Sequence, residues 1–132
     1  MKNKNIIITG TSRGIGYELA LQFANEGHQV LAISRKTPKE LIEHQNITCL
    51  SIDISNPAEL LQVEKFISQT WKKVDILIHN AGSLLHKTFT QISAEEFQNI
   101  YKVNVFAVAE LTKICIPFME KGSHVVTISS MG

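Results

Sequence analysis

The sequence predicts an α/β fold, a doubly wound parallel sheet with helices on both faces. Two observations predict it. Short apolar segments alternate with longer ones whose apolar residues recur every three or four positions, as in amphipathic helices. The short segments are apolar throughout, which is typical of parallel strands buried on both sides. Right-handed crossovers between such strands place helices on the two faces of one sheet, for which we expect the strand order 3-2-1-4-5.

The first two predicted strands flank a glycine-rich turn and a helix. Asn5–Thr9 is an apolar run that ends at Gly10, and Gln29–Ser34 is a second such run. Between them a helix begins near Gly14 and ends at Gly27. Its apolar residues recur at Ile15, Leu19 and Phe23, with Ala20 and Ala24 beside them.

Three more strands and two more helices follow. The strands are Thr48–Ile52, Asp75–His79 and His124–Ser129. Pro57 suits the first turn of a helix, whose apolar face carries Leu60, Val63, Ile67 and Trp71. Ser93 and Glu96 form a capping box for a long helix with apolar positions at Phe97, Ile100, Val108, Leu111, Cys115 and Phe118. Pro117 should kink this helix or end it.

The composition and charge are those of an ordinary globular protein. Hydrophobic residues make up 44% and charged residues 19%, with a net charge of +1, so we expect one globular domain over residues 1–132 and no nucleic-acid partner. No segment approaches the length of a membrane span, and no export signal is visible. Cys49 and Cys115 are isolated, which favours reduced thiols and a cytoplasmic location. The histidines show no ligand spacing, so no metal is expected.

The turn after the first strand predicts a dinucleotide site. Gly10, Gly14 and Gly16 lie where a strand ends and a helix begins, and glycine lets the backbone approach a pyrophosphate there. The free N–H groups of the helix N-terminus also attract an anion. The spacing is G-x3-G-x-G, so the flanking strand and helix, more than the glycines alone, indicate a nucleotide.

The end of the second strand favours NADP(H) over NAD(H). An acidic residue usually binds the adenosine ribose in NAD-selective sites, but here neutral Ser34 is followed by Arg35 and Lys36. A guanidinium can hold a 2′-phosphate by paired hydrogen bonds, and Arg13 in the glycine turn can approach the same phosphate. The alternative is that Arg35 and Lys36 are solvated loop charges.

Four ordered motifs resemble those of the classical short-chain dehydrogenase/reductases, over the whole length given. They are Thr9–Gly16, similar to the family's TGxxxGxG turn; His79–Gly82, similar to its NNAG segment with His79 replacing the first Asn; Asn104; and Ile128–Ser130. The resemblance implies a Rossmann-like fold and hydride transfer between a nicotinamide and a carbonyl or alcohol substrate. It also implies a homo-oligomer, because family helices equivalent to Val105–Met119 pack in dimers or tetramers.

The resemblance assigns roles residue by residue. Asp53 and Ile54 would contact the adenine, and Asn80, Ala81, Gly82 and Val103 would line the ribose region. The full cofactor-binding set is then Gly10, Ser12, Arg13, Gly14, Ile15, Gly16, Ser34, Arg35, Lys36, Asp53, Ile54, Asn80, Ala81, Gly82 and Val103. Asn104 would hold a water in the proton relay, and Ser130, favoured over Ser129, would hydrogen-bond the substrate carbonyl.

Plainer roles stay open for several of these residues. Asn80 and Asn104 can instead tie backbone groups of neighbouring elements, as buried asparagines often do. Tyr101 is expected to be structural, and Trp71 and Phe118 to be packing residues. Substrate identity and the direction of the reaction are left undetermined.

One family feature does not occur in these residues. The family's proton donor is a tyrosine in a YxxxK segment beyond the serine, and no YxxxK is present here. We therefore expect the amino-terminal part of a longer enzyme, lacking the sixth and seventh strands and inactive by itself. The alternative is a non-catalytic NADP-binding or dimer-forming protein whose short form is native.

Overall fold

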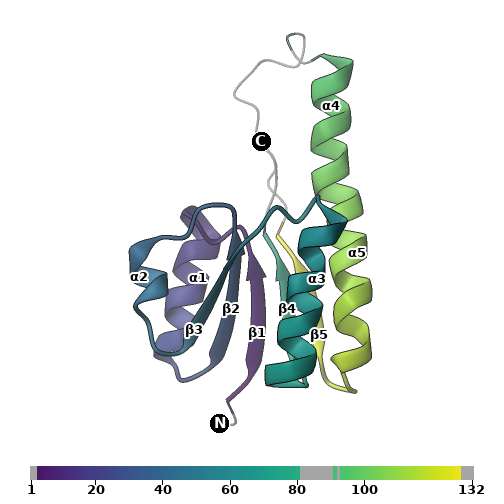
Figure 1. Ribbon diagram of the computed structural model, residues 1–132. Coiled ribbons are helices and arrows are strands. Elements are labelled where there is room, and N and C mark those ends of the chain that lie inside the picture. Colours follow the sequence, from purple (N-terminus) through teal and green to yellow (C-terminus); the bar gives the residue numbers. More distant parts are fainter. Residues whose placement is uncertain (1–2, 81–90, 92, 129–132) are drawn as a thin grey trace.

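Residues 3–80, 91 and 93–128 are described by the computed structural model, which contains a five-stranded parallel sheet in the order β3-β2-β1-β4-β5. The strands are β1 Asn5–Thr9, β2 Gln29–Ser34, β3 Ile47–Ser51, β4 Ile76–His79 and β5 His124–Thr127. All four neighbouring pairs are parallel, which confirms the predicted fold and strand order. The carboxyl ends of the strands point to the top of Figure 1.

Helices cover both faces of this sheet. Their bounds are α1 Gly14–Asn25, α2 Lys39–Ile42, α3 Pro57–Phe66, α4 Ala94–Tyr101 and α5 Ala107–Cys115. The helices α1 and α2 lie on one face, and α3 and α5 lie on the other (Figure 1). The helix α4 continues the line of α5 and extends beyond the carboxyl edge of the sheet (Figure 1).

Element bounds differ from the sequence-based expectation in small ways. The strand β3 begins and ends one residue earlier than expected, and β4 begins one residue later. The short helix α2 was not predicted, because four residues cannot show a helical period. The helix after Pro57 ends as a π-helical turn over Ile67–Trp71. Ser129, the expected end of the fifth strand, lies outside the described residues.

The helix α1 approaches the sheet through small residues. Its buried residues are Gly16, Ala20 and Ala24, whereas Ile15 is 58% exposed. The expected apolar stripe is therefore wrong at Ile15, because the buried side of the helix is rotated toward the glycine and the alanines. Leu19 and Phe23 are half-buried and pack at the edge of this contact. The small residues allow the start of α1 to lie close against the end of β1.

The long helix predicted after Ser93 is observed as a continuous series of segments. The capping box of Ser93 and Glu96 is present, and α4 is followed by a π-helical turn over Lys102–Phe106 and then by α5. The chain tightens into a 3₁₀ turn at Ile116–Phe118, which confirms the expected effect of Pro117. Phe97 was predicted to be buried but is 56% exposed, because α4 extends beyond the sheet.

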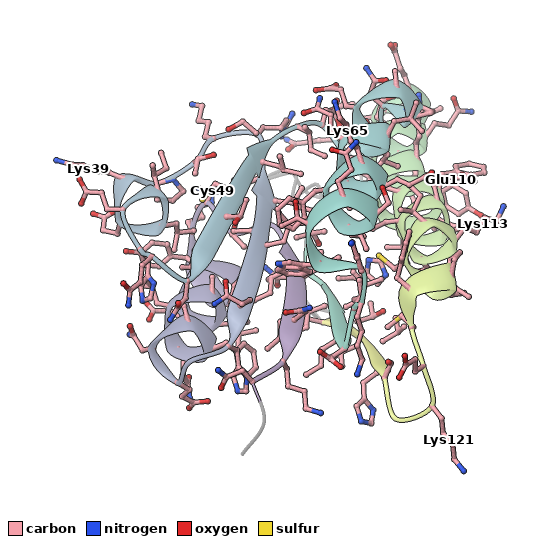
Figure 2. The ribbon with its side chains drawn as sticks, turned by 60° about the horizontal axis from the view of Figure 1, so that its bottom comes forward. Lys39, Cys49, Lys65, Glu110, Lys113 and Lys121 are labelled. Atoms are coloured by element: carbon pink, nitrogen blue, oxygen red, sulfur yellow. The ribbon has the colours of Figure 1, made fainter. Side chains whose placement is uncertain are left out.

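The core has one apolar cluster on each face of the sheet. Ala107, Leu111 and Cys115 of α5 belong to the first cluster, against which Trp71 and Phe118 pack as expected. Cys49 packs at the edge of the second cluster, and Figure 2 labels it on β3. The two cysteines are free and belong to different clusters.

Two kinds of feature are absent from the described residues. None of the helices in this part of the chain is long and apolar enough to cross a membrane. These same residues contain no group of three or more His, Cys, Asp or Glu side chains arranged to hold a metal ion.

Candidate nucleotide-binding site

The turn between β1 and α1 adopts a backbone that requires glycine. Gly10 has φ +71° and Gly14 has φ +65°, in the left-handed region that other residues avoid. The Gly10 N–H donates to the carbonyl of Ile33, 2.8 Å away, so the turn is attached to the end of β2. The predicted glycine turn and the predicted cationic end of β2 are thus brought side by side.

Gly16 lies at the most crowded point of the turn. A Cβ built there would lie 2.3 Å from the Gly10 carbonyl oxygen and 2.5 Å from the Asn80 amide nitrogen. No side chain fits at these distances, so glycine is required for α1 to begin directly against the end of β1.

The N-terminus of α1 can accept an anion. Arg13 precedes the helix with an extended backbone, and no side chain of the described residues caps the first turn. The first turn also contains no acidic residue, so its N–H groups and positive dipole end face outward without a fixed counter-charge. Ser12, Arg13, Gly14 and Ile15 are exposed at this point. The backbone therefore fits the pyrophosphate of a dinucleotide.

The end of β2 presents two cations beside this turn. Ser34 is buried, and its hydroxyl donates to the Lys36 carbonyl at 2.7 Å, which folds the chain back after the strand. Arg35 and Lys36 are exposed. Ser34 therefore shapes the turn that carries the two charged side chains, and its hydroxyl is already used within the protein.

Asp53 follows β3 at the same edge of the sheet. Its Oδ1 accepts hydrogen bonds from the backbone N–H and the hydroxyl of Ser55, at 2.9 Å and 2.6 Å. These bonds, with a smaller contribution from the positive charge of Arg35, hold the pKa of Asp53 below its usual value. Arg35 and Asp53 thus act on each other electrostatically at the carboxyl edge. The neighbouring Ile54 side chain is buried in the core.

Asn80 fastens β4 to the glycine turn. Its backbone N–H donates to Thr9 Oγ1 at 2.9 Å, and its side-chain amide donates to the Gly10 carbonyl at 3.1 Å. These hydrogen bonds tie backbone groups of adjacent elements, and the predicted contact of Asn80 with the cofactor stays a prediction. Asn80 therefore links the end of β4 to both Thr9 and Gly10.

Several predicted site residues lie wholly or in part outside the described structure. Val103 and Asn104 lie in the backbone of the π-helical turn, and their side chains fall outside the described structure. Ala81, Gly82, Ser129 and Ser130 lie outside the described residues altogether. The π-helical turn is of interest because such wide turns within α-helices are frequently found at functional sites.

Sequence reasoning missed three features of this region. Thr9 accepts the Asn80 hydrogen bond, and Thr11 is fully buried with a hydroxyl that finds no partner among the described residues. The third is an apolar pocket of about 880 Å³ between the start of α3 and the α4–α5 segment. The position of Thr9 directly before Gly10 was a usable signal for the first, but the pocket depends on how α4 extends beyond the sheet.

The fold and the turn together define a dinucleotide-binding domain of the Rossmann type. Residues 4–132 match the short chain dehydrogenase family, and the chain belongs to that family. The chain spans about half the length of the curated relatives it matches. One is the probable short-chain type dehydrogenase/reductase VdlC of Helicobacter pylori, 33% identical over 128 residues that cover 95% of this chain and 47% of that protein.

Of three further matches, one is named for NADPH and another contains bound NAD⁺. The NADPH-dependent pterin aldehyde reductase of Arabidopsis thaliana is 31% identical, covering 96% of this chain and 56% of that protein. A short-chain dehydrogenase structure from Streptomyces avermitilis has a TM-score of 0.88 at 28% identity, covering 98% of this chain and 50% of that one. A structure from Leptospira borgpetersenii with bound NAD⁺ has a TM-score of 0.79 at 25% identity, covering 89% and 46%.

Proposed function

We propose that these residues form the amino-terminal, cofactor-binding part of a longer NADP(H)-dependent reductase or dehydrogenase. The enzyme transfers a hydride between the nicotinamide and a carbonyl or alcohol substrate. Membership of the short chain dehydrogenase family supports the reaction class. The observation that carries the cofactor choice is the cationic end of β2, which the Gly10–Ile33 hydrogen bond holds beside the glycine turn.

Charge at this edge supports NADP(H) over NAD(H). Ser34 replaces the carboxylate that would repel a 2′-phosphate, and Arg35 and Lys36 extend from the turn that Ser34 shapes. Asp53, the acidic residue of the predicted site, accepts hydrogen bonds from Ser55 and interacts with the positive charge of Arg35. The pterin aldehyde reductase agrees with this choice and the NAD⁺ complex differs from it, so these residues, not family membership, carry the preference.

We assign a role in this reaction to each group of site residues. The amides of the first turn of α1 bind the pyrophosphate, Arg35 and Lys36 bind the 2′-phosphate with Arg13 approaching from the glycine turn, and Asn80 keeps Gly10 in place. The bound cofactor supplies or accepts the hydride. Ser130 hydrogen-bonds the substrate carbonyl oxygen and Asn104 holds a water of the proton relay, both as the family resemblance implies.

The same proposal includes a cytoplasmic homo-oligomer. The apolar pocket is lined by Phe97, Tyr101 and Phe106, which are 56%, 51% and 58% exposed, and the rings of Tyr101 and Phe106 meet edge to face. Aromatic side chains so exposed on a helix are typical of protein interfaces. Phe106 lies in Val105–Met119, the stretch whose equivalent packs between subunits in the family, so we assign the aromatic surface of Phe97, Tyr101 and Phe106 to subunit contact.

A turnover assay with the full-length protein tests the function. We expect NADPH oxidation with at least one member of a panel containing a pterin aldehyde, a ketosteroid, a ketoacyl thioester, a sugar and a small diketone. We also expect the coding sequence to continue beyond Gly132 into a YxxxK segment. A natural stop codon there, together with NADPH binding but no turnover, would support the non-catalytic binding protein instead.

A further inference from the structure

His79 ends β4 directly before Asn80 and differs from the asparagine that the resemblance leads one to expect. Its side chain is only 3% exposed and points to the face covered by α5, where its Nε2 lies 2.9 Å from Thr112 Oγ1. The Thr112 hydroxyl in turn lies 2.7 Å from the Val108 carbonyl, to which it donates. These contacts join a strand end at the cofactor turn to the first turns of α5.

The direction of these hydrogen bonds follows from the chemistry of the groups. A threonine hydroxyl has one proton, and in Thr112 that proton is directed to the Val108 carbonyl. Thr112 Oγ1 must therefore accept from His79, so the imidazole carries its proton on Nε2. Burial lowers the pKa of His79, which favours the neutral ring with this single tautomer.

The His79–Thr112 pair lies between the glycine turn and the π-helical turn Lys102–Phe106. On one side, the neighbouring Asn80 holds Gly10 through its side-chain amide. On the other, Val108 comes two residues after the π-helical turn Lys102–Phe106, which contains Asn104 in its backbone. A continuous path of backbone and hydrogen bonds therefore joins the glycine turn to the helix that carries Asn104.

The π-helical turn Lys102–Phe106 lies between α4 and α5, which are held in different ways. The capping box of Ser93 and Glu96 fixes the start of α4. The helix α5 is held by apolar contacts of Ala107, Leu111 and Cys115, which are not directional. A hydrogen bond has a preferred direction and length, so the bond from His79 can set the rotation and axial position of α5 more narrowly than these contacts.

We propose that His79 and Thr112 are positioning residues that hold the π-helical turn bearing Asn104 in register with the cofactor turn. The inference rests on the proposed function, because it assigns the pair to the reaction performed there. Neither residue touches substrate or cofactor. Their loss should displace the proton relay while leaving the nucleotide cradle intact.

Matched variants of the full-length protein separate positioning from packing. Thr112→Val keeps the size and shape of the side chain but removes the hydroxyl, whereas Thr112→Ser keeps the hydroxyl. We expect Thr112→Val to lower kcat by about 10- to 100-fold with KM for NADPH within about twofold, since small misplacements in a site cost this much. Thr112→Ser should stay within about twofold of the unmutated enzyme in both constants. His79→Gln, which retains a terminal N–H donor, should lose less kcat than His79→Leu.

Two readouts do not depend on turnover, so a failure of the proposed function can be distinguished from a failure of this inference. Nitrogen NMR of the imidazole should show a proton on Nε2 and none on Nδ1. Hydrogen exchange of the amides at 102–108 should accelerate at least about tenfold in Thr112→Val and little in Thr112→Ser. Unchanged exchange and kcat in Thr112→Val, even with a lower Tm, or a proton on Nδ1, would overturn the proposal. Absence of NADPH binding would instead contradict the proposed function.

Discussion

Gly16 and Asn80 share the most crowded point of the nucleotide turn, and the space between them limits what either residue can be. Gly16→Ala would bring a Cβ within 2.3 Å of the Gly10 oxygen and 2.5 Å of the Asn80 amide. We expect a loss of about 1–3 kcal/mol in the free energy of unfolding, the usual cost of overpacking, and weakened nucleotide binding. Chemical denaturation and nucleotide titration of the full-length protein measure the two effects.

Gly14→Ala is the matched control for this variant. A Cβ at Gly14 meets nothing within 4 Å, but its φ of +65° is unfavourable for alanine. Backbone strain alone should cost about 1–2 kcal/mol. If Gly16→Ala binds nucleotide as tightly as the unmutated protein, the close approach of α1 to the turn is not needed for binding.

His79 predicts a pH dependence of stability whose sign follows from its burial. Burial lowers its pKa below the ordinary value of 6.5, so the folded protein binds this proton less readily than the unfolded chain. The contribution to stability is therefore fully present above pH 6.5 and decreases as the pH falls toward the lower pKa of the folded state. Urea unfolding at several pH values between about 5 and 8 should show a steeper loss below pH 6.5 for the unmutated protein than for His79→Gln. Parallel curves for the two proteins would contradict this assignment.

Residues near the turn show what a sequence can and cannot predict. Gly10 and Gly14 were identifiable because a positive φ admits few residue types, so the residue type itself signals the backbone. Asparagine can serve both as a cofactor contact and as a backbone tie, so the sequence left both roles open for Asn80, and only the fold shows its bond to Gly10. Thr112 was not singled out, since its partner His79 lies 33 residues away and nothing local marks the pair.

The spacing of apolar residues predicted the longer strands and helices correctly. The strands and the helices starting at Gly14, Pro57 and Ala94 were predicted with small errors in their bounds. Periodicity failed at Ile15 and Phe97, because which side of a helix is buried depends on how the helix is placed on the sheet. The π-helical turn Lys102–Phe106 has no signal in the pattern, since one wide turn shifts the apolar period by a single residue.

The strand β5 is the element from which we expect association. It pairs with β4 on one side, and its Val125 and Val126 are 47% and 42% exposed. An exposed apolar edge can pair with another chain, so a 132-residue chain produced by itself should self-associate or be marginally stable. Val126→Lys should reduce this association, because a charged edge disfavours strand pairing. Light scattering measures it, and a stable monomer of the unmutated chain at tens of micromolar would contradict the expectation.

At the scale of the whole molecule, the aromatic surface of α4 and the π-helical turn after it predicts a subunit contact. Phe106→Glu places a charge in the apolar pocket and should shift the full-length protein toward smaller species in analytical ultracentrifugation. Gln69→Glu adds the same charge at an exposed position outside the lining of that pocket and should leave the oligomer unchanged. An identical sedimentation profile for Phe106→Glu would place the contact elsewhere.

Nucleotide titration of the full-length protein tests most directly whether this is an NADP(H) enzyme. The unmutated protein should bind NADPH more tightly than NADH. Arg35→Ala should weaken NADPH binding by about 1.5–3 kcal/mol, the usual contribution of a hydrogen bond to a charged group, and change NADH binding little. Equal affinity of the unmutated protein for the two nucleotides would contradict the assignment of Arg35 and Lys36 to a 2′-phosphate.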